Sequence, residues 1–242
     1  LLWGAAGLIA VAGIPILWVL LRQERTPQSM AQSGQVLGMR AVHWTRNQTF
    51  GHPLFWFMVP ALLGPGAFNT AFFFHQVHFA DIKQMTHVEL VSMLPFYTVV
   101  SIMAMGLSGW LLDKIGTPRL IPWYQLPMVA SFVIFAYADS YSAMMLGFFF
   151  LALTNGGNAT LPNAFWAEFY GTRHLGSIKA MAAAVMVLGS AIGPGITGLG
   201  IDLGVGLETQ YIWIAGYFVV ATVMMALGVG RFRSDLAQSR AA

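Results

Sequence analysis

Long apolar runs alternate with short polar turns along almost the whole chain. Seven runs come close to the ~20 residues that a helix needs to cross the hydrocarbon core of a bilayer. They cover residues 1–21, 53–79, 90–112, 118–138, 141–167, 176–201 and 210–230. This pattern predicts an all-α fold, a polytopic transmembrane helix bundle with seven spans in this chain.

One long polar stretch interrupts the pattern, from Arg22 to His52. It divides the chain into a helix at 1–22, a linker at 23–52, a six-helix bundle at 53–230 and a tail at 231–242. Two alternatives stay open for the apolar residues of the linker: a short amphipathic helix on the membrane surface, or a partly disordered tether. These residues are Val36, Leu37, Met39, Val42 and Trp44.

The composition agrees with a membrane protein. Hydrophobic residues make up 57% of the chain and charged residues 9%, and the mean hydropathy is +0.67. A soluble domain carries roughly a quarter of charged residues, so the outside of this bundle must face lipid. The net charge is only +3 and the basic residues sit at helix ends, which gives no support for nucleic-acid binding.

The basic residues also indicate the orientation. The linker, the turns at Lys114 and Arg173 and the tail all carry basic residues on one side of the bundle, whereas only Lys83 lies on the other. By the positive-inside rule we expect a multi-pass protein of the bacterial inner membrane, with linker and carboxyl terminus cytoplasmic. The first run lacks a basic leader and a cleavage site, and it begins without Met, so we expect a membrane helix of a longer protein.

A polar turn between two apolar runs carries a spaced motif: Gly109, Asp113, Lys114, Gly116 and Arg119. This spacing resembles the loop signature of the major facilitator superfamily of secondary transporters. That family has the motif between helices 2 and 3 and again between helices 8 and 9. One helix, a cytoplasmic linker and six helices match helices 6 to 12, so the resemblance implies the carboxyl-terminal half of that fold.

Two further segments, residues 170–179 and 189–195, resemble the branch of the family that contains monocarboxylate and oxalate–formate carriers. Residues 74–78 resemble bacterial members near that branch. Carriers of that branch hold an anion with buried basic residues in this half. Here no Asp, Glu, Lys or Arg lies deep in any apolar run, so the substrate is less charged or its charge partner lies in the other half.

The resemblance implies a secondary active transporter that moves a small solute, such as an organic anion or a small metabolite, by alternating access. It implies coupling to a proton or other ion gradient, or exchange, with no cofactor. The expected partners are the small-molecule substrate, the lipid bilayer and the amino-terminal half of the same transporter. The histidines near residue 78 lack a carboxylate or fourth ligand in register, so we expect no metal site.

Polar residues inside membrane spans are costly and therefore mark candidate substrate contacts. The candidates are Asn69, His75, Gln76, Tyr97, Ser101, Thr154, Asn155 and Asn158. The alternative role for each is an interhelical hydrogen bond. His75 is also the candidate for proton coupling, because histidine titrates near physiological pH.

A glycine stripe in the run 176–201 has two readings. Gly189, Gly193 and Gly195 allow close helix contact, and Pro194 permits a bend, so these residues serve either packing or a gating hinge. Asp113 could point at the amino end of a neighbouring helix. In the family this aspartate is thought to lock the cytoplasmic side against helix 11.

The pattern of apolar runs leaves other classes of membrane protein to consider beside a transporter. A seven-helix receptor or photoprotein fits the span count, but the last run, 210–230, lacks the lysine that a retinal Schiff base needs. A membrane enzyme would need a convergent cluster, and Glu168, Arg173 and His174 do not share one face. A partner-dependent membrane protein that does not transport stays open as an alternative.

Overall fold

The computed structural model describes residues 7, 11, 13–15, 18 and 36–241. The chain divides into two units, Leu1–Gln35 and Val36–Ala242, and only the second is described as a continuous fold. The predicted helix at 1–22 and the first part of the predicted linker therefore lie almost entirely outside the described residues.

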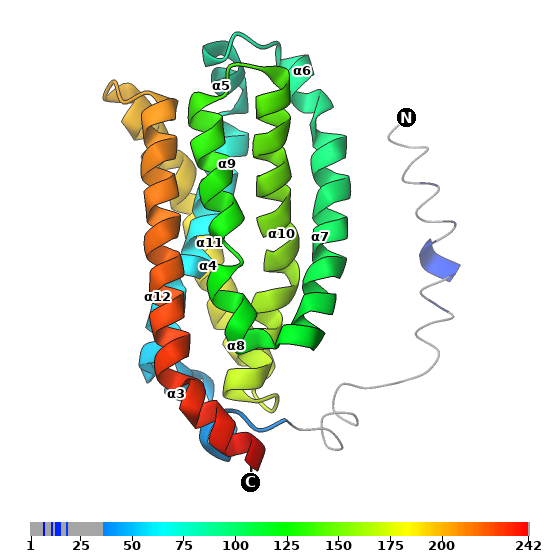
Figure 1. Cartoon of the computed structure of the whole chain (residues 1–242), viewed down its shortest axis with the longest axis vertical. Helices are drawn as coiled ribbons and strands as arrows, with labels where there is room; N and C mark the ends of the chain where they lie inside the picture. Colours follow the sequence, from blue (N-terminus) through cyan, green and yellow to red (C-terminus); the bar gives the residue numbers. More distant parts are fainter. Residues whose placement is uncertain (1–6, 8–10, 12, 16–17, 19–35, 242) are drawn as a thin grey trace. The chain divides into compact units, whose positions relative to one another are not determined.

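The second unit is all helical in its described part, which confirms the predicted fold class (Figure 1). Its elements are η1 Met39–Ala41, α3 Arg46–Gly51, α4 Pro53–Phe74, α5 Gln76–Ile82, α6 His87–Ser92, α7 Leu94–Ile115, α8 Thr117–Leu120, η2 Ile121–Trp123, α9 Leu126–Tyr137, α10 Tyr141–Tyr170, α11 Leu175–Asp202 and α12 Leu207–Ala241.

Five helical stretches among the described residues are long and apolar enough to cross a membrane, so the predicted count of seven is not reproduced. They are Pro53–Phe74, His87–Ile115, Thr117–Tyr137, Leu175–Asp202 and Leu207–Leu236. The first predicted span lies outside the described residues. Helix α10 has 30 residues and is long enough to cross. Its middle carries Thr154, Asn155 and Asn158, whose polar side chains lower its hydropathy.

Proline shapes these helices in two different ways. The predicted run 118–138 is split into α8, η2 and α9, and each of the three has a proline in its first turn. Proline is tolerated there because the first-turn N–H groups have no helical partner. In contrast, Pro65 of α4, Pro162 of α10 and Pro194 of α11 lie inside helices that continue through them.

The six long helices pack in a fixed order of neighbours. Helix α7 packs on α10, α10 on α9, α9 on α12, α12 on α4 and α4 on α11, whereas α10 and α11 touch only lightly. Figure 1 shows α8, α3 and the carboxyl-terminal end of α12 at one end of the bundle, and α5 and α6 at the other. We call the first the basic end, because Arg40, Lys114, Arg119 and Arg233 lie there.

Glycines let α4 and α11 approach until their backbones touch. A Cβ on Gly189 would lie 2.5 Å from the carbonyl oxygen of Leu63. A Cβ on Gly193 would overlap the carbonyl of Ala67, and one on Gly66 would overlap that of Met186. In contrast, nothing lies within 4 Å of a Cβ on Gly195. The stripe on α11 therefore includes two glycines that the packing requires and one that it does not.

The described part of the predicted linker closes the basic end of the bundle. Met39 is fully buried in the cluster that also contains Tyr170 of α10 and Leu236 of α12. The backbone N–H of Trp44 donates to the carbonyl of Tyr170 at 3.0 Å, and the Thr172 N–H donates to that of Val36 at 3.1 Å. The described part of the linker is therefore packed on the bundle rather than a free tether. Met39 is buried, whereas Val36, Leu37 and Val42 are exposed.

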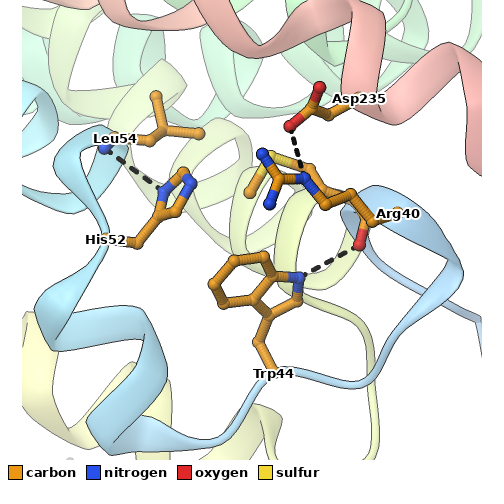
Figure 2. A network of polar contacts seen from close by, with 6 residues as sticks. Arg40, Trp44, His52, Leu54 and Asp235 are labelled. Atoms are coloured by element: carbon orange, nitrogen blue, oxygen red, sulfur yellow. Dashed lines mark hydrogen bonds and ion pairs between the residues drawn. The ribbon is translucent and has the colours of Figure 1, made fainter.

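A polar cluster holds this segment against α12 (Figure 2). Arg40 donates from Nε to Asp235 at 2.9 Å, and the Trp44 indole N–H donates to the Met39 carbonyl at 3.1 Å. His52 lies beside them, where its Nδ1 accepts the Leu54 N–H at 3.3 Å and so caps the start of α4. The accepting Nδ1 places the proton of the neutral ring on Nε2.

At the opposite end of the bundle, the side chain of Lys83 connects α9 and α12. The Lys83 side chain is only 4% exposed, and its ammonium donates to Glu208 at 2.5 Å and to the Ala136 carbonyl at 2.9 Å. Ala136 lies in the last turn of α9 and Glu208 in the first turn of α12. The helix dipoles favour this arrangement, because the lysine cation lies at the carboxyl end of α9 and the Glu208 anion at the amino end of α12.

Replacing Gly193 by leucine should destabilise the bundle. The new side chain would collide with the backbone of α4, and overpacking of this kind costs about 1–3 kcal/mol. Gly195→Leu is the matched control, because its Cβ meets no neighbour. Thermal unfolding of the detergent-purified chain measures both. Equal midpoints for the two variants would contradict the described α4–α11 contact.

Acidification should destabilise the basic end through His52. Burial, and to a smaller degree Arg40, lower the pKa of His52 below its ordinary value. The unfolded chain therefore binds the proton more readily, so stability is lost as the pH falls through about 6.5 and stops changing below the folded-state pKa. His52→Asn keeps a capping side chain without this titration. Its thermal midpoint should depend less on pH than that of the wild type, and an unchanged pH dependence would contradict this assignment.

Candidate functional site

A cavity of about 230 Å³ lies where α4, α10 and α11 meet. Ligand sites in proteins usually measure about 300–1,000 Å³, so this one suits a small solute. Its polar side chains are those of Asn158, Asn163 and Lys179. Its apolar walls include Leu62, Pro162, Trp166 and Met186.

The cavity extends from the basic end toward the middle of the bundle. Asn158 lies 12 residues before the last residue of α10, which is about 18 Å along the helix axis. Lys179 lies four residues after the start of α11, and it is the only charged side chain among the described lining residues. Its long stem can follow the apolar wall and present the ammonium to the cavity. The Nδ2 of Asn163 donates to the Ala159 carbonyl at 2.8 Å, which leaves its Oδ1 as an acceptor.

A buried chain of hydrogen bonds fixes Asn158. The Tyr124 hydroxyl donates to the Oδ1 of Asn158 at 3.3 Å. The Gln125 Nε2 donates to the Tyr124 hydroxyl at 3.0 Å and to the Ala61 carbonyl at 2.6 Å. The chain thus connects α10 to α4 through the residues that precede α9. With its Oδ1 engaged, Asn158 keeps its NH₂ group for a ligand.

The bond from Gln125 to the Ala61 carbonyl replaces a backbone hydrogen bond that α4 lacks. In a helix the carbonyl of Ala61 would accept from the N–H of residue 65, but residue 65 is proline and has none. Gln125 supplies the missing donor. An orphaned carbonyl inside a membrane costs several kcal/mol, so this amide has a structural role as well as a link to the site.

The loop motif lines a second cavity of about 590 Å³ at the basic end. Asp113, Lys114 and Gly116 all contribute to it, together with Glu168 of α10 and Val36. Gly116 has φ +81°, a conformation that favours glycine and lets the chain turn between α7 and α8. The described lining contains no residue of α11, and the lock of Asp113 against helix 11 that the family resemblance implied stays a prediction.

The other two residues of the motif lie elsewhere. Nothing lies within 4 Å of a Cβ on Gly109, so no close helix contact requires this glycine here. Arg119 lines a separate cavity between α8, η2 and α12. The motif therefore does not form one site in this structure.

The remaining candidate residues are dispersed. His75 ends α4, where its Nδ1 lies 3.0 Å from the Ala71 carbonyl, and Gln76 starts α5. The Tyr97 ring lies between Phe73 of α4 and Phe148 of α10, at centroid distances of 5.9 and 6.1 Å.

Four polar residues lie nearer the middle of the bundle. The Asn69 Oδ1 and the Thr154 Oγ1 are buried without a hydrogen-bond partner among the described residues. The Ser101 carbonyl is in close contact with Gly156, next to Asn155. Of the eight predicted polar candidates, only Asn158 is among the residues that line the cavity between α4, α10 and α11.

Sequence reasoning missed four residues of this region: Tyr124, Gln125, Asn163 and Lys179. The sequence offered a signal for Gln125, because it is a polar amide inside the apolar run 118–138, which has Pro118 and Pro122 near its start. Lys179 ends the segment 170–179 that carries part of the family resemblance, and α11 begins four residues before it.

No group of three or more His, Cys, Asp or Glu side chains that could hold a metal ion occurs in the part of the chain that the structure describes.

The apolar helices of this bundle define a multi-pass α-helical membrane protein. The family model of the Major Facilitator Superfamily matches residues 86–240, so the chain belongs to this superfamily of membrane transporters. No curated protein matches the chain. The predicted superfamily is thereby confirmed, and members of this family are transporters rather than enzymes.

Replacing Gln125 by methionine should destabilise the bundle by about 1–3 kcal/mol, because the Ala61 carbonyl loses its donor. Pro65→Ala restores a backbone N–H at that place. In the Pro65→Ala background the same Gln125→Met change should therefore cost less. A double-mutant cycle of thermal or denaturant unfolding measures the difference. Equal costs in the two backgrounds would contradict the repair role of Gln125.

Proposed function

We propose that this chain forms the carboxyl-terminal half of a secondary active transporter that moves a small organic anion or similar small metabolite. The observation that carries the proposal is the cavity between α4, α10 and α11, in a chain that belongs to a transporter superfamily. One ammonium and two amides, from Lys179, Asn158 and Asn163, suit a carboxylate with a further polar group.

The substrate proposal differs from what the apolar runs suggested. No acidic or basic residue lies deep in an apolar run, which left either a weakly charged substrate or a charge partner in the other half. Lys179 changes this, because it lines the cavity together with Asn158 although it starts near the basic end. A single lysine in the cavity favours a substrate with one negative charge. For the same reason, the proposal keeps the branch of the monocarboxylate and oxalate–formate carriers.

We propose that the amino-terminal half of the transporter covers the faces of α7 and α11 that flank this cavity. Each of the two helices packs mainly on one neighbour, α10 or α4. Both expose large apolar side chains, such as Met103 at 69% and Val187 at 66%. Rocking of two halves around a site between them is the general route to alternating access. We infer from the positive-inside rule that the basic end, from which the cavity extends, faces the cytoplasm.

We propose His75 for coupling to a proton gradient. It ends α4 at the end of the bundle opposite the basic end, and its Nε2 lies 3.5 Å from the place of a Cβ on Gly198 of α11. A charge gained by this ring would act on the contact between α4 and α11. Asn69 and Thr154 remain further candidates, because each holds a buried oxygen without a partner among the described residues.

Uptake or export in vesicles by the gene product that contains this chain tests the proposal. The solutes are a panel of small carboxylates and neutral metabolites, with and without a proton gradient. Lys179→Gln and Asn158→Ala should each lower carboxylate flux by about tenfold or more, since each removes a hydrogen bond to a charged group, worth about 1.5–3 kcal/mol.

Arg173→Gln is the matched control, because it removes a charge at the same end outside the cavity lining. It should leave flux nearly unchanged. His75→Gln should keep flux and lose its dependence on the gradient. Flux that survives both cavity substitutions would refute the proposed site, and equal losses in Arg173→Gln would show a general charge effect.

A further inference from the structure

A cavity outside the proposed solute site combines arginines with an apolar surface. It measures about 260 Å³ and lies at the basic end, between α12 and the α8–η2 segment. Arg119 and Arg233 line it together with Pro118, Trp123, Val229 and Gly230. No acidic residue is among the described lining residues, and no ion pair joins either arginine to a carboxylate in the described part of the chain.

The nearest acidic residue on α12 is engaged elsewhere. Asp235 follows Arg233 by two positions, which places it on a different face of the helix. It pairs with Arg40 at 2.9 Å. The positive charge of Arg119 and Arg233 is therefore uncompensated by this helix. Two guanidinium groups facing one cavity match the geometry of a phosphate group.

The surface above the cavity is apolar and open. On α12, Val219, Val223 and Leu227 are 45%, 50% and 61% exposed, and they follow one another at helical spacing. On the neighbouring α9, Leu126 is exposed as well. From Val219 to Gly230 the helix rises about 17 Å, close to half of the ~30 Å hydrocarbon core.

This surface belongs to helices that do not line the proposed solute cavity. The cavity with Asn158 and Lys179 is formed by α4, α10 and α11, whereas α9 and α12 pack on each other, α9 also on α10 and α12 also on α4. Trp123 is 56% exposed beside the arginines. Tryptophan is enriched where hydrocarbon meets the headgroup layer, so its position sets the depth of the cavity at that layer.

We propose that this cavity binds the phosphate of an anionic phospholipid, with Arg119 and Arg233 as ligands and one acyl chain along α9 and α12. Basic pockets between membrane helices are suited to such headgroups. Inorganic phosphate offers the same chemistry to the arginines but lacks the acyl chain. The apolar stripe that continues from the cavity favours the lipid.

The test places the chain in nanodiscs of phosphatidylcholine and replaces a small fraction with brominated phosphatidylglycerol or brominated phosphatidylcholine. Bromine quenches nearby tryptophans, so the excess quenching by the anionic lipid reports its enrichment beside Trp123. Arg119→Gln with Arg233→Gln should lower the apparent affinity by about tenfold or more, and Trp123→Phe should remove most of the excess signal. Arg119→Lys with Arg233→Lys should retain a large part of it.

The matched control is Arg46→Gln with Arg173→Gln, which removes the same charge at the same end but lies outside this cavity. It should leave the excess quenching nearly intact. An equal loss in both double variants would overturn the proposal in favour of general attraction to the basic end. Displacement by inorganic phosphate beyond that by chloride at equal ionic strength would also overturn it, since the site would then take free phosphate. Absence of excess quenching in the wild type would do the same.

Discussion

The structure depends on the need to satisfy a carbonyl that a proline has left without a donor. Inside a bilayer no water is at hand, so every backbone group must find its partner within the protein. Gln125 meets this need for Ala61 at 2.6 Å, and it reaches across from the start of α9 to α4 to do so. Through the Tyr124 hydroxyl the same amide also orients Asn158 in the cavity. The group that repairs α4 therefore also positions the proposed solute ligand.

Close packing explains where that cavity can exist. Gly189 and Gly193 bring α11 onto α4 until backbones touch, and Gly156 does the same for α10 on α7. Because each pair is tight and α10 touches α11 only lightly, space remains between the pairs. Asn158 of α10 and Lys179 of α11 line this space. The opposite side, formed by α9 and α12, carries exposed apolar side chains and suits lipid.

The sequence predicts the superfamily and the helical fold, whereas the course of residues 36–52 and the composition of the cavity could not be predicted, for physical reasons. Spacing along one turn, from Gly109 to Arg119, pointed to the superfamily because the motif is local. The course of residues 36–52 could not be predicted, since burial of Met39 and the pairing of Arg40 with Asp235 depend on residues almost 200 positions away. The candidate polar residues were chosen for their cost in lipid, which marks them as special without saying what they contact. Only tertiary packing separates Asn158, in the cavity, from Tyr97, between two aromatic rings.

The central claim is that the space between α4, α10 and α11 is a solute path that opens and closes. The chain contains no cysteine, so a single introduced thiol reports on its own position. We would measure labelling of Ala183→Cys, which lines the cavity without being a proposed ligand, by a membrane-impermeant maleimide from the basic-end side. Leu227→Cys on the exposed face of α12 is the control. The account predicts that small carboxylates or a reversed proton gradient slow labelling at residue 183 and leave residue 227 unchanged. A labelling rate at residue 183 that no solute or gradient alters would contradict it.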